Sequence, residues 1–227
     1  MFGLTPQEKA YLGPFAIFLG FIALGQFVAK LGEGLAFWPV AEPRYWVNPL
    51  QTLVCGALLI RYWRDYQWEK PRGTGFTLLI GVLVFAIWVA PQALHLAAPR
   101  LEGFEPHFFG GGAAYATNVF LRFLRLVVVV PLVEEIFWRG FLLRYLIDHD
   151  FIKVPFGTFE WRSFAVVTIG FCLEHQMADW PAAIVAGALY NLVAYRTRSL
   201  SACVLAHAVT NLLLGMYVLR TGQWGFW

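Results

Sequence analysis

Long apolar runs separated by short polar segments dominate the pattern along the chain. A run of about twenty apolar residues is long enough to cross the roughly 30 Å hydrocarbon core of a bilayer as an α-helix. Periodicity adds little, because lipid permits a helix that is apolar on every side. The pattern therefore predicts a bundle of seven or eight transmembrane helices, with apolar runs at residues 10–29, 47–63, 75–96, 126–147, 164–175, 181–195 and 200–219.

Composition supports this prediction and excludes other classes of protein. The chain is 59% hydrophobic and 14% charged, against roughly 45–50% and about 25% in soluble domains. A soluble fold of 227 residues has too much surface to hide so many apolar side chains. Three cysteines are too few for a disulfide-stapled secreted module, and a net charge of +3 gives no support for a nucleic-acid partner. We therefore expect an all-α polytopic membrane protein, with residues 1–227 forming a single domain in the lipid bilayer.

Basic residues concentrate in alternate polar segments. Under the positive-inside rule these segments face the cytoplasm, which predicts a cytoplasmic N-terminus and an outer C-terminus. Two further basic residues, Arg122 and Arg125, precede the run that begins at residue 126, and we expect them at the outer interface. The basic residues of the three cytoplasmic turns are Arg61, Arg64, Lys70 and Arg72, then Arg144, Lys153 and Arg162, then Arg196 and Arg198.

Ionisable residues inside the apolar runs are the strongest indication of chemistry, because each costs about 2.5–3.5 kcal/mol at a helix centre. The first cluster contains the adjacent carboxylates Glu134 and Glu135, followed by Arg139. The spacing of four residues allows Glu135 and Arg139 to pair on one helix face. Glu134 is then free to act as a general base. A purely structural salt-bridge network is an equally good explanation of this cluster taken alone.

Two further clusters follow. Glu174 and His175 end an apolar run, and His207 and Asn211 lie one helical turn apart in the last run. Two polar side chains on one face can bind a polar ligand or a developing oxyanion. Taken singly, snorkelling and interhelical hydrogen bonding explain these residues better. Three such clusters on three helices favour a functional site.

The order of these motifs resembles the CPBP family of intramembrane proteases, which includes the CAAX prenyl endopeptidases and the bacterial Abi proteins. The resemblance rests on Glu134-Glu135-x-x-x-Arg139, on Phe171-x-x-x-His175 and on His207-x-x-x-Asn211. It extends over residues 126–214, the expected protease core. Trp138 stands where the family often has Phe, and Glu174 is an additional acid.

The resemblance implies a helical bundle with a cavity below the cytoplasmic surface and a glutamate-dependent mechanism without metal or other cofactor. In that mechanism, Glu134 and His175 activate the attacking water. His207 and Asn211 stabilise the oxyanion, while Glu135 and Arg139 support Glu134. The implied substrate is a membrane-associated protein or peptide, with or without a lipid anchor, and the implied location is a bacterial inner membrane.

Three alternatives remain open from the sequence. Glu134, His175 and His207 are acceptable zinc ligands, although the H-E-x-x-H helix of many zinc proteases is absent. A non-catalytic immunity or protein-sorting factor could keep the same residues for stability. A transporter or proton relay also uses intramembrane Glu and His, but the chain shows no obvious inverted repeat.

Overall fold

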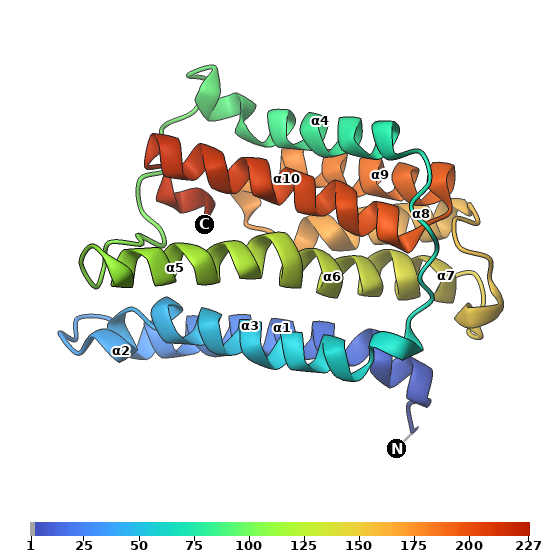
Figure 1. Ribbon diagram of the computed structural model, residues 1–227, viewed down its shortest axis with the longest axis horizontal. Coiled ribbons are helices and arrows are strands. Elements are labelled where there is room, and N and C mark those ends of the chain that lie inside the picture. Colours follow the sequence, from blue (N-terminus) through green and yellow to red (C-terminus); the bar gives the residue numbers. More distant parts are fainter. Residues whose placement is uncertain (1–2) are drawn as a thin grey trace.

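The computed structural model describes residues 3–227, and every regular element in that range is helical, which confirms the predicted all-α class. The long helices lie side by side along a common direction (Figure 1). The α-helices are α1 (Pro6–Leu31), α2 (Trp38–Ala41), α3 (Arg44–Arg61), α4 (Thr74–Ala93), α5 (Ala113–Phe123), α6 (Val130–Glu135), α7 (Leu143–Tyr145), α8 (Trp161–Leu173), α9 (Trp180–Thr197) and α10 (Leu200–Thr221).

Five helical segments are long and apolar enough to cross a membrane, and large apolar side chains are exposed along them. The protein is therefore an integral membrane protein. Helix α3 lies beside α1 but is not among the five, because polar residues such as Asn48 and Gln51 lower its hydropathy. The five segments are Pro6–Leu31, Thr74–Ala93, Ala113–Tyr145, Met177–Thr197 and Leu200–Thr221.

Helices α5, α6 and α7 form one continuous 33-residue segment, Ala113–Tyr145. Two π-helical stretches, η2 (Leu124–Val129) and η3 (Ile136–Leu142), flank α6 within it. The prediction that this helix begins at residue 126 is wrong. It begins thirteen residues earlier, because Arg122 is buried inside the bundle instead of marking the end of a span.

Helix α8 is short, and its length sets the depth of the residues that follow it. The Glu160 carboxylate caps its first turn by accepting hydrogen bonds from the backbone N–H groups of Arg162 and Ser163. Its 13 residues extend only about 20 Å, less than a bilayer core. Glu174 and His175, which follow Leu173, therefore lie within the depth of the bundle.

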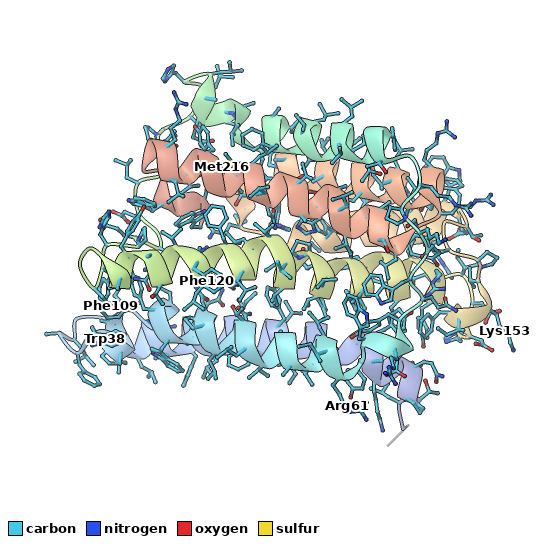
Figure 2. All side chains as sticks on the ribbon, viewed as in Figure 1. Trp38, Arg61, Phe109, Phe120, Lys153 and Met216 are labelled. Carbon is cyan, nitrogen blue, oxygen red and sulfur yellow. The ribbon has the colours of Figure 1, made fainter. Side chains whose placement is uncertain are left out.

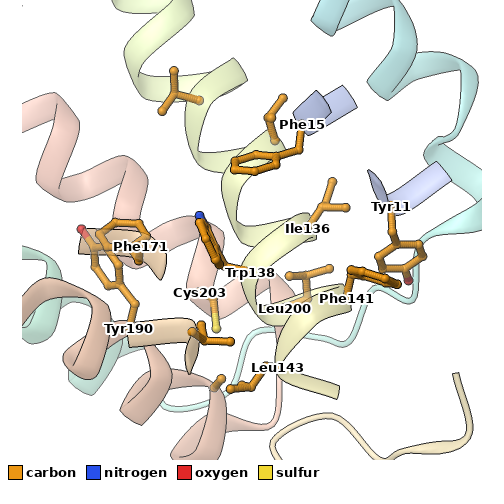
Figure 3. Packing of buried hydrophobic residues seen from close by; sticks show 14 of the residues in the cluster. Tyr11, Phe15, Ile136, Trp138, Phe141, Leu143, Phe171, Tyr190, Leu200 and Cys203 are labelled. Atoms are coloured by element: carbon orange, nitrogen blue, oxygen red, sulfur yellow. The ribbon is translucent and has the colours of Figure 1, made fainter. Parts of the chain in front are cut away.

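Two glycines allow neighbouring helices and side chains to approach closely in this part of the bundle. A side chain at Gly81 of α4 would place its Cβ 2.7 Å from the carbonyl oxygen of Ala206 in α10, so only glycine permits this approach. Gly170 of α8 likewise makes room for the ring of Trp138, which would lie 2.7 Å from an added Cβ. In Figure 3, Trp138 lies among the buried aromatic side chains, with Phe171 and Tyr190 nearby.

The two ends of the bundle differ in charge. Figure 2 shows Arg61 and Lys153 at one end, with Trp38 and Phe109 at the other. The chain order places the three basic turns of the sequence at the first end. The C-terminal residues lie at the second, where the backbone N–H of Gly225 donates to the carbonyl oxygen of Arg100.

Candidate active site

A cavity of about 560 Å³ lies between α1, α6, α8 and α10. Glu134, His175, His207 and Asn211 all line it, together with Glu174. It extends to the bundle end that carries the C-terminus, where the exposed residues Arg44 and Gln176 and the terminal Trp227 form part of its wall. The four residues expected to carry chemistry therefore share one cavity.

Glu134 is almost fully buried, with 5% of its surface exposed, and no residue in the described part of the chain donates a hydrogen bond to its buried Oε2. Its nearest basic partner is His207, whose Nε2 lies 3.9 Å from Oε2. This separation is too long for a direct hydrogen bond, and it suits a bridging water. A buried carboxylate without a partner is costly, so Glu134 has acceptor capacity directed at whatever occupies the cavity.

Glu135 points away from the cavity into a fully buried network. Its Oε1 accepts from Arg139 Nη1 at 3.0 Å, which is the ion pair expected from the spacing. The same oxygen lies 2.9 Å from His207 Nδ1. A carboxylate at this nitrogen favours the tautomer with hydrogen on Nδ1. Glu135 and Arg139 thus fix the orientation of His207, a contact that the sequence did not reveal.

Helix α9 supplies the remaining hydrogen-bond acceptors of Arg139. The Arg139 guanidinium donates to Asn191 Oδ1 and to the carbonyl oxygen of Gly187, each at 3.0 Å. Asn191 in turn donates to Thr168 Oγ1, and Tyr190 stacks on His207 with ring centroids 5.0 Å apart. Sequence reasoning missed Tyr190 and Asn191, although a Tyr-Asn pair inside an apolar run is a signal that could have found them.

His175 and Glu174 face the cavity from the end of α8. His175 Nδ1 lies 2.8 Å from the carbonyl oxygen of Phe171. A carbonyl only accepts, so Nδ1 carries the hydrogen and Nε2 presents a lone pair. The indole of Trp138 donates to Glu174 Oε2 at 3.0 Å. The Glu174 and Glu134 carboxyl groups are near enough to interact, which places this additional acid within the candidate site.

Asn211 lies on the same face of α10 as His207 and one turn further along. Its side-chain amide donates to the backbone carbonyl of Leu126 at 2.8 Å. An amide nitrogen has two hydrogens, so a second donor remains. The geometry shows a structural contact that the sequence did not suggest.

Arg122 and Arg125 also line the cavity, and the prediction that they snorkel at the outer interface is wrong. The Arg122 guanidinium lies near the rings of Phe104 and Trp227, at 5.1 Å and 5.9 Å from their centroids. Arg125 Nε donates to Gln51 Oε1 at 2.8 Å. Aromatic faces and an internal amide attract these guanidinium groups into the bundle.

The zinc alternative requires three ligands at one point. In the described part of the chain, residues 3–227, no group of three His, Cys, Asp or Glu side chains is arranged to hold a metal ion. The donor set therefore does not fit a three-residue zinc centre built on Glu134, His175 and His207.

Fold and site together define an integral membrane protein of the polytopic helical class, with a polar carboxylate–histidine cluster buried in its bundle. Residues 116–213 match the model of the family described as type II CAAX prenyl endopeptidase Rce1-like. This part of the chain is therefore similar to that family, in agreement with the resemblance. No curated protein and no solved structure matches the chain.

Proposed function

We propose that the protein is an intramembrane endopeptidase of the CAAX-protease type that hydrolyses a peptide bond near the terminus of a membrane-associated substrate. The observation that carries this proposal is the Glu134 carboxylate, buried and without a hydrogen-bond partner at Oε2, in a cavity shared with His175 and His207. The family match over residues 116–213 supports it.

In the proposed reaction, Glu134 takes a proton from a water held between its carboxylate and the Nε2 atom of His175. The resulting hydroxide attacks the carbonyl carbon, and the carbonyl oxygen becomes a tetrahedral oxyanion. The C–N bond then breaks, and the leaving amine receives the proton from Glu134. A positioned base of this kind contributes about 10²–10⁴-fold to a rate.

The remaining polar residues have separate roles in this proposal. His175, with its lone pair on Nε2, helps to hold the water. His207, held at Nδ1 by Glu135, donates through Nε2 to the oxyanion in the doubly protonated form that this role requires, together with the second amide hydrogen of Asn211. Preorganised donors at such a position are worth about 2.7–4 kcal/mol each. Arg139 positions Glu135 and has no contact with the substrate.

We further propose a bacterial inner membrane location with the N-terminus in the cytoplasm, on the strength of the basic turns. If the N-terminus is cytoplasmic, the cavity does not open at the cytoplasmic surface, contrary to what the resemblance implied. The cavity opens at the end that carries Arg44 and the C-terminal Trp227, opposite the basic turns. We therefore propose that the site opens to the outer side.

The experiment that tests the activity uses purified protein in lipid nanodiscs and membrane-anchored peptides, with and without a prenyl group, analysed by mass spectrometry. The proposal expects the wild-type protein to cleave at least one peptide and the Glu134→Gln variant to cleave it at least about 10²-fold more slowly. Cleavage by that variant at the wild-type rate, or no cleavage of any peptide by the wild type, would contradict it.

A further inference from the structure

Two arginines in the cavity have no role in the hydrolysis just described. Arg122 is 6% exposed and lines the cavity, and its Nε is buried without a hydrogen-bond partner. Arg125 lines the same cavity and donates only through Nε, to Gln51. Neither belongs to any of the ion pairs within residues 3–227, so no carboxylate lies within 4.0 Å of either guanidinium.

Burying a guanidinium without an anion is expensive, at several kcal/mol per ion after relaxation. The nearby rings of Phe104 and Trp227 offset only part of that cost, since a desolvated cation–π contact is worth about 2 kcal/mol. Packing does not require a guanidinium at this position, because an apolar side chain would fill the aromatic pocket at lower cost. Arg122, which has no carboxylate among the charged groups that act on it, therefore indicates an anionic ligand in the cavity, and Arg125, which interacts at longer range with Glu134, borders the same space.

We propose that Arg122 and Arg125 bind the free C-terminal carboxylate of the peptide substrate; this inference rests on the proposed function. A guanidinium presents paired N–H donors that match a carboxylate. Gln51 holds Arg125 in place, because its own Nε2 donates to the carbonyl oxygen of Phe18 at 2.8 Å.

The position of the arginines along the helix agrees with this role. Arg125 and Arg122 precede Glu134 by nine and twelve residues on one continuous helix, which corresponds to roughly 13–18 Å. An extended peptide advances about 3.3 Å per residue. A terminal carboxylate at the arginines thus places a peptide bond further upstream in the substrate beside Glu134.

A lipid phosphate is the other source of the same chemistry. The peptide is favoured because Arg122 lies inside the bundle, next to Phe104 and the terminal Trp227, in the cavity that also holds Glu134. A carboxylate bound there places the rest of the peptide along the cavity toward the catalytic groups. A headgroup bound there would obstruct that path.

The test is a binding measurement, which does not depend on cleavage. Acetyl-Leu-Leu-Leu with a free carboxylate and its C-terminal amide are titrated, by calorimetry, into the wild-type protein in phosphatidylcholine nanodiscs. The inference expects the acid to bind at least tenfold more tightly than the amide. It expects Arg122→Met to abolish this preference, Arg122→Lys to retain part of it, and Arg64→Met, an exposed arginine at the opposite end, to leave it unchanged.

Equal binding of acid and amide by the wild type would overturn the inference, and this result needs no variant to fold. A preference retained in Arg122→Met would overturn it as well. Repeating the titration with phosphatidylglycerol in the discs separates the two anions: loss of the acid preference there would assign the arginines to a lipid headgroup. A preserved acid preference without any cleavage would contradict the proposed function and leave the carboxylate site standing.

Discussion

The side-chain amide of Asn211 donates a 2.8 Å hydrogen bond to the backbone carbonyl of Leu126. Leu126 lies in the π-helical stretch Leu124–Val129, where an N–H bonds to the carbonyl five residues earlier, as Val130 does to Arg125. The next residue, Pro131, has no N–H to offer Leu126. Asn211 therefore satisfies a carbonyl that the proline leaves free, about two turns before Glu134.

This relationship predicts that the stability cost of losing Asn211 depends on Pro131. Asn211→Ala leaves the partly buried carbonyl of Leu126 unpaired and should lower the free energy of unfolding by about 1–3 kcal/mol. In a Pro131→Ala background the restored N–H can bond to Leu126, so the same substitution should cost less than about 0.5 kcal/mol. Unfolding in detergent, measured for all four combinations, provides the double-mutant cycle.

Activity separates the two roles of Asn211 in the same variants. If Asn211 also donates to the oxyanion, Asn211→Ala remains slow in the Pro131→Ala background even though stability recovers. Equal stability costs in both backgrounds would show that the proline and the amide are not coupled.

The buried pair of Glu135 and Arg139 predicts a large stability effect of a single substitution. Arg139→Met leaves a carboxylate uncompensated at a position with 0% exposure, and the expected loss is about 3–5 kcal/mol. Adding Glu135→Leu should recover part of that loss, because it removes the carboxylate that has lost its arginine partner. Arg64→Met, an exposed arginine, is the matched control and should change stability by less than about 0.5 kcal/mol. A milder effect of Arg139→Met than of the double variant would contradict this account.

The cap of α8 predicts a dependence of stability on pH. Two backbone N–H groups at Arg162 and Ser163 hold the pKa of the Glu160 carboxyl below its usual value. A group with a lowered folded-state pKa contributes stability above its unfolded pKa and loses it as pH falls through the folded value. Glu160→Gln should therefore lower the melting temperature near neutral pH and have a smaller effect in acid. Equal effects at pH 7 and at the acidic end of the range in which the protein folds would contradict the cap.

The charge asymmetry of the bundle predicts which side of the membrane each end occupies. The cysteines of the described chain are all buried, so single exposed cysteines can be introduced as reporters. Glu102→Cys, at the end where the cavity opens, should react with an impermeant maleimide in intact cells. Lys70→Cys, in a basic turn, should react only after lysis. The reverse pattern would place the cavity on the cytoplasmic side.

Hydropathy predicted α1, α4, α9 and α10 well because lipid-facing helices must be apolar along most of their length. It failed at the start of α5, because a sequence does not show that the ring of Phe104, far from Arg122 in the chain, covers its guanidinium. The pairing of Glu135 with Arg139 was predictable from a spacing of four. The contact between Glu135 and His207 was not, since 72 residues separate them and only the packing of α10 against α6 brings them together.

The central claim is that Glu134 is the general base, and the initial rate of peptide cleavage by Glu134→Gln tests it most directly. The substitution keeps the shape of the side chain and removes its basicity, so the rate should fall by about 10²–10⁴-fold or more. Glu33→Gln, at an exposed position after α1, is the matched control and should retain the wild-type rate. The melting temperature of each variant verifies that it is folded. A folded Glu134→Gln variant that cleaves at the wild-type rate would contradict the account.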